Sequence, residues 1–266
     1  MAAALNQPDE DLPMASSPRL GGIPEELVEV LVSLVGFHDA CSLRLTGREL
    51  AYEASQGVFR THFRTKTIRV SQTQDLVLMT RPGNIGCHVQ HLSLTVTVPV
   101  QPNREGVDDG LRFRLEPLGQ ALKQLRKNSP LGRLVPLSLT VDGVREDGSI
   151  VPAYRVQDYE EVSDAAAAQF ETAVRALGES NIPVDRFDVF GGVVRCSLAC
   201  DRIATTLNGP PAPLQSVKQL SISLSPHMGD LNGPSGIRFG ETGAKSASGV
   251  CRFLGLCSSL QELQLH

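Results

Sequence analysis

The sequence predicts an α/β protein in which a short three-helix module is followed by an irregular helix–strand solenoid. Two patterns in the 266 residues lead to this prediction. Between residues 24 and 55, leucines and valines recur at helical spacing. From about residue 66 onward, short runs in which every second residue is apolar alternate with helical stretches. We therefore expect a disordered tail at 1–20, a helical module at 21–65 and a helix–strand region at 66–266.

The tail prediction rests on composition. Pro8, Pro13 and Pro18 interrupt an acidic stretch that contains serine and few apolar residues. A segment of this kind cannot bury enough apolar surface to offset the entropy lost on ordering. Order is expected to begin near Gly21.

The first helix is expected to begin at Pro24 and to end before Gly36. Proline suits the first helical position because its φ is already helical and its missing N–H would be unbonded there. Leu27, Leu31 and Leu34 follow at i, i+4 and i+7, a spacing that predicts one buried stripe. Valines between these leucines make the helix apolar on most sides. It therefore needs more than one neighbour, either the protein's own core or a docking partner.

Two further short helices are expected in the module. Asp39 can cap a helix that carries Leu45. Thr46, followed by Glu49 three residues later, matches a capping box for the third helix. Three short helices in this interval predict a compact bundle.

The region from 66 onward predicts strands and helices in alternation. The predicted strands are 67–70, 91–96, 136–141, 186–189, 219–224 and 262–265, and the predicted helices are 72–79, 118–126, 165–177, 198–207 and 250–257. Strands that are separated by single helices favour parallel pairing, with helices on one or both faces of the sheet.

A recurring Leu-x-x-Leu-x-Leu motif, clearest at 260–265, makes this region similar to leucine-rich repeats. Its strand centres are about 33 to 50 residues apart, whereas regular leucine-rich repeats span about 20–29 residues. The predicted solenoid is therefore irregular, and a doubly wound sheet is the alternative. Because repeat arrays need terminal caps and the last residues read as a strand, we expect either a truncated chain or an edge covered by a partner.

Composition excludes several classes of protein. The formal net charge of −4 disfavours a nucleic-acid binder, which usually has a basic surface. No apolar run approaches the roughly 20 residues that span a bilayer, and the first residues do not resemble a signal peptide. Six dispersed cysteines and the absence of Asn-x-Ser/Thr sites favour a reducing compartment, cytoplasmic and/or nuclear.

The sequence contains no motif of a common catalytic centre, so we expect a non-enzyme without a cofactor. Gly-x-Ser-x-Gly, Gly-x-Gly-x-x-Gly and His-Glu-x-x-His are all absent. Cys87, His88 and His91 are potential zinc ligands, but no fourth ligand is evident nearby, so no metal site is predicted. An α/β enzyme whose site combines distant residues is the alternative.

Two stretches of the helical module resemble an F-box domain, most closely in the F-box proteins of filamentous fungi. Residues 23–31 read Ile-Pro-Glu-Glu-Leu-Val-Glu-Val-Leu, and residues 40–50 read Ala-Cys-Ser-Leu-Arg-Leu-Thr-Gly-Arg-Glu-Leu. That family has a Leu-Pro-x-Glu-Leu-type helix and then a Ser-Leu-Arg-Leu-Thr-Cys-Arg-x-Leu-type stretch. Ile23 stands here for the usual leucine and Gly47 for the usual cysteine.

The resemblance implies a substrate receptor of an SCF-type (cullin–RING) ubiquitin ligase. The box would bind the adaptor protein of the cullin complex, and the region after it would bind a target protein, without nucleic acid or membrane. Carried over by position, the adaptor-facing or core residues are Ile23, Pro24, Leu27, Leu31, Leu43, Arg44, Leu45 and Leu50. The alternative is a non-catalytic repeat scaffold, unrelated to ubiquitination, whose first helices cap the solenoid.

Overall fold

The chain forms two compact units, Met1–His62 and Phe63–His266. The structure, a computed structural model, describes residues 23–54, 57–69, 72–101, 114–206, 214–225 and 241–266. The tail predicted at 1–20 lies outside the described residues. The two units are described separately below.

The described residues of unit 1 form helices joined by short turns. Its helices are α1 (Glu25–Leu34), α2 (Phe37–Leu45), α3 (Arg48–Glu53) and α4 (Gly57–Thr61). Helix α1 contacts α3 and α4, and α2 contacts α3. The predicted three-helix module is therefore wrong. The additional helix α4 forms because Phe59, which is 0% exposed, anchors it in the core of the unit.

The capping box predicted for the third helix is also wrong. The N-cap of α3 is Gly47, and no side chain caps this helix. The hydroxyl of Thr46 instead donates to the carbonyl of Leu43 at 2.7 Å, at the end of α2. Likewise, α2 is capped by Gly36, and Asp39 lies in its first turn. Asp39 is still favourably placed there, because the start of a helix carries positive partial charge.

Unit 2 is built on a seven-stranded sheet. Its strands are β1 (Thr65–Arg69), β2 (His91–Pro99), β3 (Leu137–Val144), β4 (Ile150–Pro152), β5 (Arg186–Val189), β7 (Gln219–Ile222) and β9 (Glu262–Leu265). The order across the sheet is β1-β2-β3-β5-β7-β9, all parallel, and β4 pairs antiparallel with β3. A second, two-stranded sheet joins β6 (Leu198–Ala199) to β8 (Leu224–Ser225).

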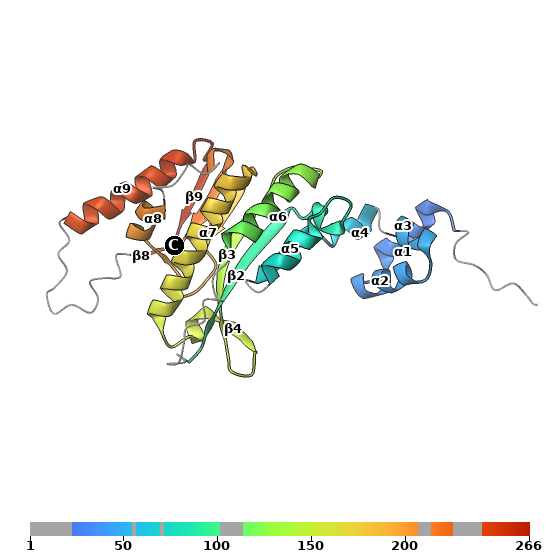
Figure 1. Ribbon diagram of the computed structural model, residues 1–266, viewed down its shortest axis with the longest axis horizontal. Coiled ribbons are helices and arrows are strands. Elements are labelled where there is room, and N and C mark those ends of the chain that lie inside the picture. Colours follow the sequence, from blue (N-terminus) through green and yellow to red (C-terminus); the bar gives the residue numbers. More distant parts are fainter. Residues whose placement is uncertain (1–22, 55–56, 70–71, 102–113, 207–213, 226–240) are drawn as a thin grey trace, which may run out of the picture. The chain divides into compact units, whose positions relative to one another are not determined.

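The helices of unit 2 pack side by side on the sheet (Figure 1). They are α5 (Thr73–Met79), α6 (Leu115–Asn128), α7 (Tyr159–Ser180), α8 (Cys200–Thr206) and α9 (Glu241–Leu256), with short 3₁₀ turns η3 (Ile85–His88), η5 (Ala153–Arg155) and η6 (Leu214–Ser216). Successive helices of this series contact one another, from α5 to α9. They therefore form one layer.

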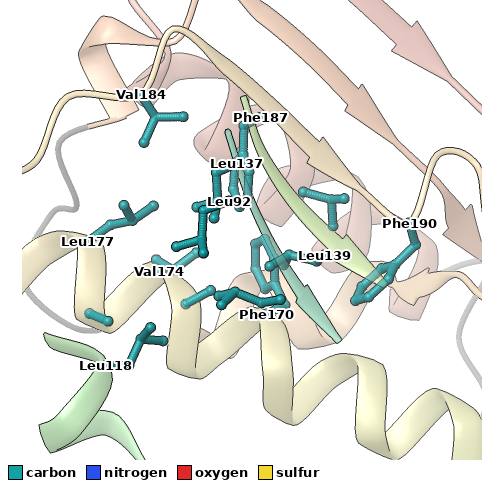
Figure 2. Packing of buried hydrophobic residues seen from close by; sticks show 14 of the residues in the cluster. Leu92, Leu118, Leu137, Leu139, Phe170, Val174, Leu177, Val184, Phe187 and Phe190 are labelled. Carbon is teal, nitrogen blue, oxygen red and sulfur yellow. The ribbon is translucent and has the colours of Figure 1, made fainter. Parts of the chain in front are cut away.

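Apolar and polar residues alternate along the strands, so one face of the sheet is apolar and covered by helices and the other face is polar. On the covered face, Leu92, Leu137, Phe187 and Leu220 lie in register and are at most 1% exposed. Figure 2 shows Phe170 of α7 pointing into this row from the helix layer. Side chains at the intervening strand positions lie on the opposite face and are mostly polar.

The leucine-rich-repeat-like solenoid predicted for 66–266 is wrong. The predicted strands all form, but they belong to one mostly parallel central sheet with a single hydrophobic core. In a solenoid each repeat contacts only its neighbours, whereas α7 alone contacts β2, β3, β6, α6 and α8. The doubly wound alternative does not fit either, because it requires a reversal in strand order.

Candidate functional site

Helix α1 buries its valines and exposes its leucines. Val28 and Val32 are 0% and 2% exposed, whereas Leu27 and Leu31 are 55% and 40% exposed. One residue turns a helix by about 100°, so the two stripes face different directions. The expected buried leucine stripe is therefore wrong. Both stripes are apolar, and the smaller valine side chains are the ones that pack in the core of unit 1.

Four residues of α1 form an exposed apolar surface, here called the leucine face: Leu27, Val30, Leu31 and Leu34. They are 55%, 52%, 40% and 77% exposed, and their i, i+3, i+4, i+7 spacing places them on one side of the helix. Val30 and Leu34 were not among the predicted contact residues, although the spacing of Leu34 pointed to it. Tyr52 of α3, 69% exposed, was also missed, and no sequence pattern marks it.

The remaining predicted contact residues fall into different environments. Leu45, at the end of α2, is 89% exposed, whereas Leu43 is half-buried. Leu50 is 3% exposed and belongs to the core, so it supports α3 and has no surface to offer a partner. Ile23 is half-buried and Pro24 is the exposed N-cap of α1.

Arg44 has a structural contact within unit 1. Its guanidinium carbon lies 4.7 Å from the centroid of the buried Phe59 ring. A guanidinium over an aromatic face is attracted by the ring quadrupole, so this contact ties α2 to α4. The predicted adaptor-binding set therefore divides into exposed apolar residues and residues that hold the bundle together.

Unit 2 presents a second candidate surface, the polar face of its sheet. One row crosses this face in register from β1 to β9: Thr67, Ser93, Ser138, Asp188, Ser221 and Gln264. In the next row, the hydroxyls of Thr95 and Thr140 are 2.8 Å apart and hydrogen-bonded. The row offers closely spaced donors and acceptors on a rigid support.

Two hydroxyl–imidazole contacts of this face resemble part of a catalytic site, Thr65 with His91 at 3.2 Å and Ser221 with His266. The hydroxyl of Ser221 lies 3.2 Å from Nε2 of His266. Asp188, however, lies on β5, across Ser221 from β9, and its carboxylate accepts the N–H of Gly191 at 2.9 Å. A triad needs the carboxylate on the imidazole, on the side away from the nucleophile. This order of residues makes a polar network and does not make a triad.

A hollow lies beside this network, with a volume of about 70 Å³. It is lined by Arg186, Gln219, Leu220, Ser221, Glu262 and Gln264. Pockets for organic ligands are usually about 300–1,000 Å³. The hollow is therefore large enough for water and too small for an organic substrate.

The cysteines of the described chain are free thiols, several of them buried. Burial raises the pKa of Cys196 to about 12 and the pKa of Cys257 to about 11. The thiol of Cys87 donates to the carbonyl of Arg81 at 3.1 Å, and burial raises its pKa as well. These thiols are neutral near pH 7 and are poor nucleophiles.

Among the residues that the structure describes, no three histidine, cysteine or acidic side chains are grouped so as to hold a metal. Within the same residues, none of the helices has the length and apolar content needed to cross a membrane. The chain matches no protein-family model, and no curated protein matches it. Function must therefore be argued from the surfaces described above.

Proposed function

We propose that this chain is a non-catalytic substrate receptor of an SCF-type (cullin–RING) ubiquitin ligase. In this proposal, unit 1 binds the adaptor protein of the cullin complex and unit 2 binds the target protein. The observation that carries the proposal is the leucine face, on which four apolar residues of one helix are 40–77% exposed. The resemblance of residues 23–31 and 40–50 to an F-box supports the same role.

The leucine face has the chemistry of a helix that enters an apolar groove. Leu27, Leu31 and Leu34 are spaced at i, i+4 and i+7, as in the anchors of groove-bound helices. Full burial of a leucine is worth about 1.5–3 kcal/mol, so covering this face would stabilise a complex considerably. Glu25 and Glu26 are exposed in the first turn of α1, which favours a groove with basic residues at its rim.

The polar face of the sheet is the surface that we assign to the target. Protein–protein interfaces combine close packing with about one hydrogen bond per 100–200 Å². Hydroxyl, amide and carboxylate groups along one row, such as Ser138, Asp188 and Gln264, can supply bonds at that density. A sheet holds them in fixed positions, so little entropy is lost when a target binds.

We place this function in the cytoplasm and/or the nucleus. The six cysteines are free thiols, and reducing compartments keep thiols free. Ubiquitin ligases of the SCF type work in the same compartments. Localisation of the tagged full-length chain by fluorescence microscopy checks this part of the proposal.

Co-purification with the adaptor tests the proposal. The full chain and the adaptor are co-expressed, and the complex is captured through a tag on the chain. Wild type should retain the adaptor, and Leu27→Asp and Leu31→Asp should lose it while keeping the circular dichroism spectrum of wild type. The matched control is Leu78→Asp on α5, a leucine that is 42% exposed in unit 2 and should not affect capture.

Two results would reject the proposal. The first is a wild-type chain that never retains the adaptor. The second is a Leu27→Asp variant that unfolds the chain, because that outcome would make α1 a structural cap of a non-catalytic scaffold.

A further inference from the structure

The connections that lead into the parallel strands of unit 2 carry positive charge. Because β1, β2, β3, β5, β7 and β9 are parallel, these connections all enter the sheet at the amino ends of the strands. They are residues 63–64, 80–90, 129–136, 181–185, 207–218 and 257–261. Their charged residues are Arg64, Arg81, Arg133, Asp185 and Lys218, so cations outnumber acids here although the whole chain has a formal net charge of −4.

Helix α6 ends at this surface with basic residues in its last turn. The side-chain amide of Asn128 donates to the carbonyl of Thr80 at 3.0 Å, which places Arg81 beside the end of α6. The guanidinium of Arg126 donates to the carbonyl of Ser180 at 3.3 Å, which joins the ends of α6 and α7. Three helices therefore end side by side at the edge where the strands begin.

We call this surface the basic end. It comprises five exposed residues: Arg81, Arg126, Lys127, Arg133 and Lys218. The carboxylate of Asp185 is shared, because it lies 3.5 Å from Arg133 and 3.9 Å from Lys218. A second acid, Glu179, pairs with Lys123 at 3.9 Å. Within the described part of the chain, the other three cations of the basic end have no carboxylate partner.

An exposed leucine lies beside these cations. Leu131 is 47% exposed in the connection between α6 and β3. The N–H of Gly132 donates to the carbonyl of Ser129 at 3.1 Å, and Gly132 has a φ of +59°. A side chain at Gly132 would meet the carbonyl oxygen of Arg126 at 3.3 Å, so this turn folds back against the end of α6. Leu131 is thereby held next to the basic residues of that helix.

We propose that the basic end binds an acidic segment of the target protein, one that also carries an apolar side chain for Leu131. This inference rests on the proposed function and adds the chemistry of the target. The segment runs extended along the edge of the sheet, and its carboxylates pair with the arginine and lysine side chains. The step from β2 to β7 is three strand spacings of about 4.8 Å, or roughly 15 Å, which about five extended residues cover.

The basic end adjoins the polar face of the sheet, to which we assign the target. Lys218 directly precedes Gln219, which lies on the polar face in register with Arg186 and Glu262. Arg186 and Glu262 carry opposite charges, so the border between the two surfaces is balanced and the excess positive charge belongs to the basic end. A target on the polar face can therefore reach the basic end with a flanking acidic segment.

A polypeptide fits this surface better than a nucleic acid does. Proteins that bind single-stranded nucleic acids combine basic grooves with aromatic side chains on which the bases stack. The exposed tyrosines of unit 2, Tyr154 and Tyr159, are at the other end of the strands. Tyr154 follows β4, which pairs with the last residues of β3, and Tyr159 begins α7, whose last residue Ser180 lies at the basic end. Leu131 offers an apolar contact in place of a stacking platform.

Fluorescence anisotropy with the full chain and a labelled peptide tests the proposal. The probe is a peptide of about ten residues, long enough to cross the basic end, in which aspartate and glutamate alternate around one central leucine. Wild type should bind it with a dissociation constant on the order of 10–100 μM at about 0.1 M salt. Binding should be at least about tenfold weaker at about 1 M salt, where the Debye length falls from about 10 Å to about 3 Å.

Charge reversals locate the binding surface. Arg126→Glu combined with Lys127→Glu should weaken binding at least about tenfold. The matched control is Arg145→Glu combined with Arg155→Glu, because these exposed arginines lie at the other end of the strands and the change in net charge is the same. The control should change binding less than about twofold, since charges far beyond the Debye length are screened.

A second pair of reversals covers the case in which loss of the Arg126 bond to α7 disturbs the fold. Arg81→Glu combined with Lys127→Glu changes side chains that are exposed and have no ion pair within the described residues. This variant should keep the circular dichroism spectrum of wild type and still bind the peptide at least about tenfold more weakly.

The apolar contact is tested by a cycle of changes in the chain and in the peptide. Leu131→Ala should weaken binding of the leucine peptide about threefold, because less apolar surface is buried. It should not affect a peptide in which alanine replaces the central leucine. Equal losses with the two peptides would overturn the role of Leu131.

The proposal is overturned if wild type fails to bind the peptide at concentrations up to about 1 mM. It is also overturned if the reversals at the two ends weaken binding equally, or if a single-stranded DNA of about ten nucleotides binds more tightly than the peptide. Adaptor capture is measured separately on the same variants. Loss of peptide binding with intact capture rejects the basic end alone, and failed capture with intact peptide binding rejects the receptor function alone.

Discussion

Leu50 holds unit 1 together from inside its core. It is 3% exposed on α3, a helix that contacts α1 in the same small unit. Leucine-to-alanine changes at buried positions cost about 2–5 kcal/mol, because apolar contact is lost and a cavity remains. A small bundle has little stability to spare.

We expect Leu50→Ala to lower the free energy of unfolding of unit 1 by about 2–5 kcal/mol. Leu27→Ala, at a position 55% exposed, should change it by less than about 0.5 kcal/mol. Urea unfolding followed by circular dichroism measures both. Equal losses for the two variants would show that the leucine face is part of the core.

The thiol of Cys196 makes stability depend on alkaline pH. Burial raises its pKa from 9.0 to about 12 in the folded state, while the unfolded chain keeps the ordinary value. Below pH 9 the thiol is neutral in both the folded and the unfolded chain, and its burial costs no ionisation. As the pH rises from 9 toward 12, the unfolded chain loses the thiol proton more readily than the folded chain, and the stability of the folded state falls. Other groups titrate in the same range, so a variant is needed to isolate this thiol.

Cys196→Ala should unfold with a shallower loss of stability between pH 9 and 11 than wild type. Urea unfolding at a series of pH values gives the two slopes. Cys251→Ala is the control, because Cys251 is exposed. Identical slopes for Cys196→Ala and wild type would contradict the buried, neutral thiol.

Helix α7 is the element around which the core of unit 2 is arranged. The ring of Phe170 is stacked with Phe187 at 6.5 Å between centroids and meets Phe253 edge-on at 5.6 Å. The three rings come from α7, β5 and α9. The helix thus joins segments that are far apart in the sequence.

Phe170→Ala should cost unit 2 about 3–5 kcal/mol, because all three rings are buried. Glu171→Ala is the matched control on the same helix. Its ion pair with Arg175 is solvent-exposed at 3.5 Å, and such pairs contribute less than about 1 kcal/mol. Thermal unfolding measures both variants. A loss below about 1 kcal/mol for Phe170→Ala would mean that α7 is not central to the core.

Element boundaries could be predicted where a local signal exists and not elsewhere. The strand at 262–265 has the predicted bounds, since leucines alternate there with polar residues. Helix α7 begins before the predicted residue 165, because Asp158 caps it by accepting from Glu160 and Glu161. The position of helix α1 could be predicted, but which of its sides is buried could not, because one side carries valines and another carries leucines.

The whole sheet depends on pairings that no local pattern contains. Strand order, the single helix layer and the antiparallel β4 follow from contacts between residues far apart in the sequence. A repeated Leu-x-Leu phrase arises equally in a solenoid and in an ordinary parallel sheet, because both bury alternate residues. The leucine face could be anticipated as apolar, but its exposure depends on which stripe the bundle covers.

The two units should unfold as separate steps, because each has its own core. Hydrogen exchange at low urea, resolved by peptide, should show Leu50→Ala accelerating exchange in the helices of unit 1 alone. Phe170→Ala should accelerate it in the strands of unit 2 alone. Equal effects of either variant on both units would indicate one cooperative body.

Hydrogen exchange of the full chain with and without the purified ligase adaptor is the most direct test of the central claim. Side chains of the leucine face would be covered by the adaptor, and the amides of α1 would open less often. We predict slower exchange at residues 25–34 at saturating adaptor, with β2 and β3 unchanged. Unchanged exchange in α1 under those conditions would contradict the account.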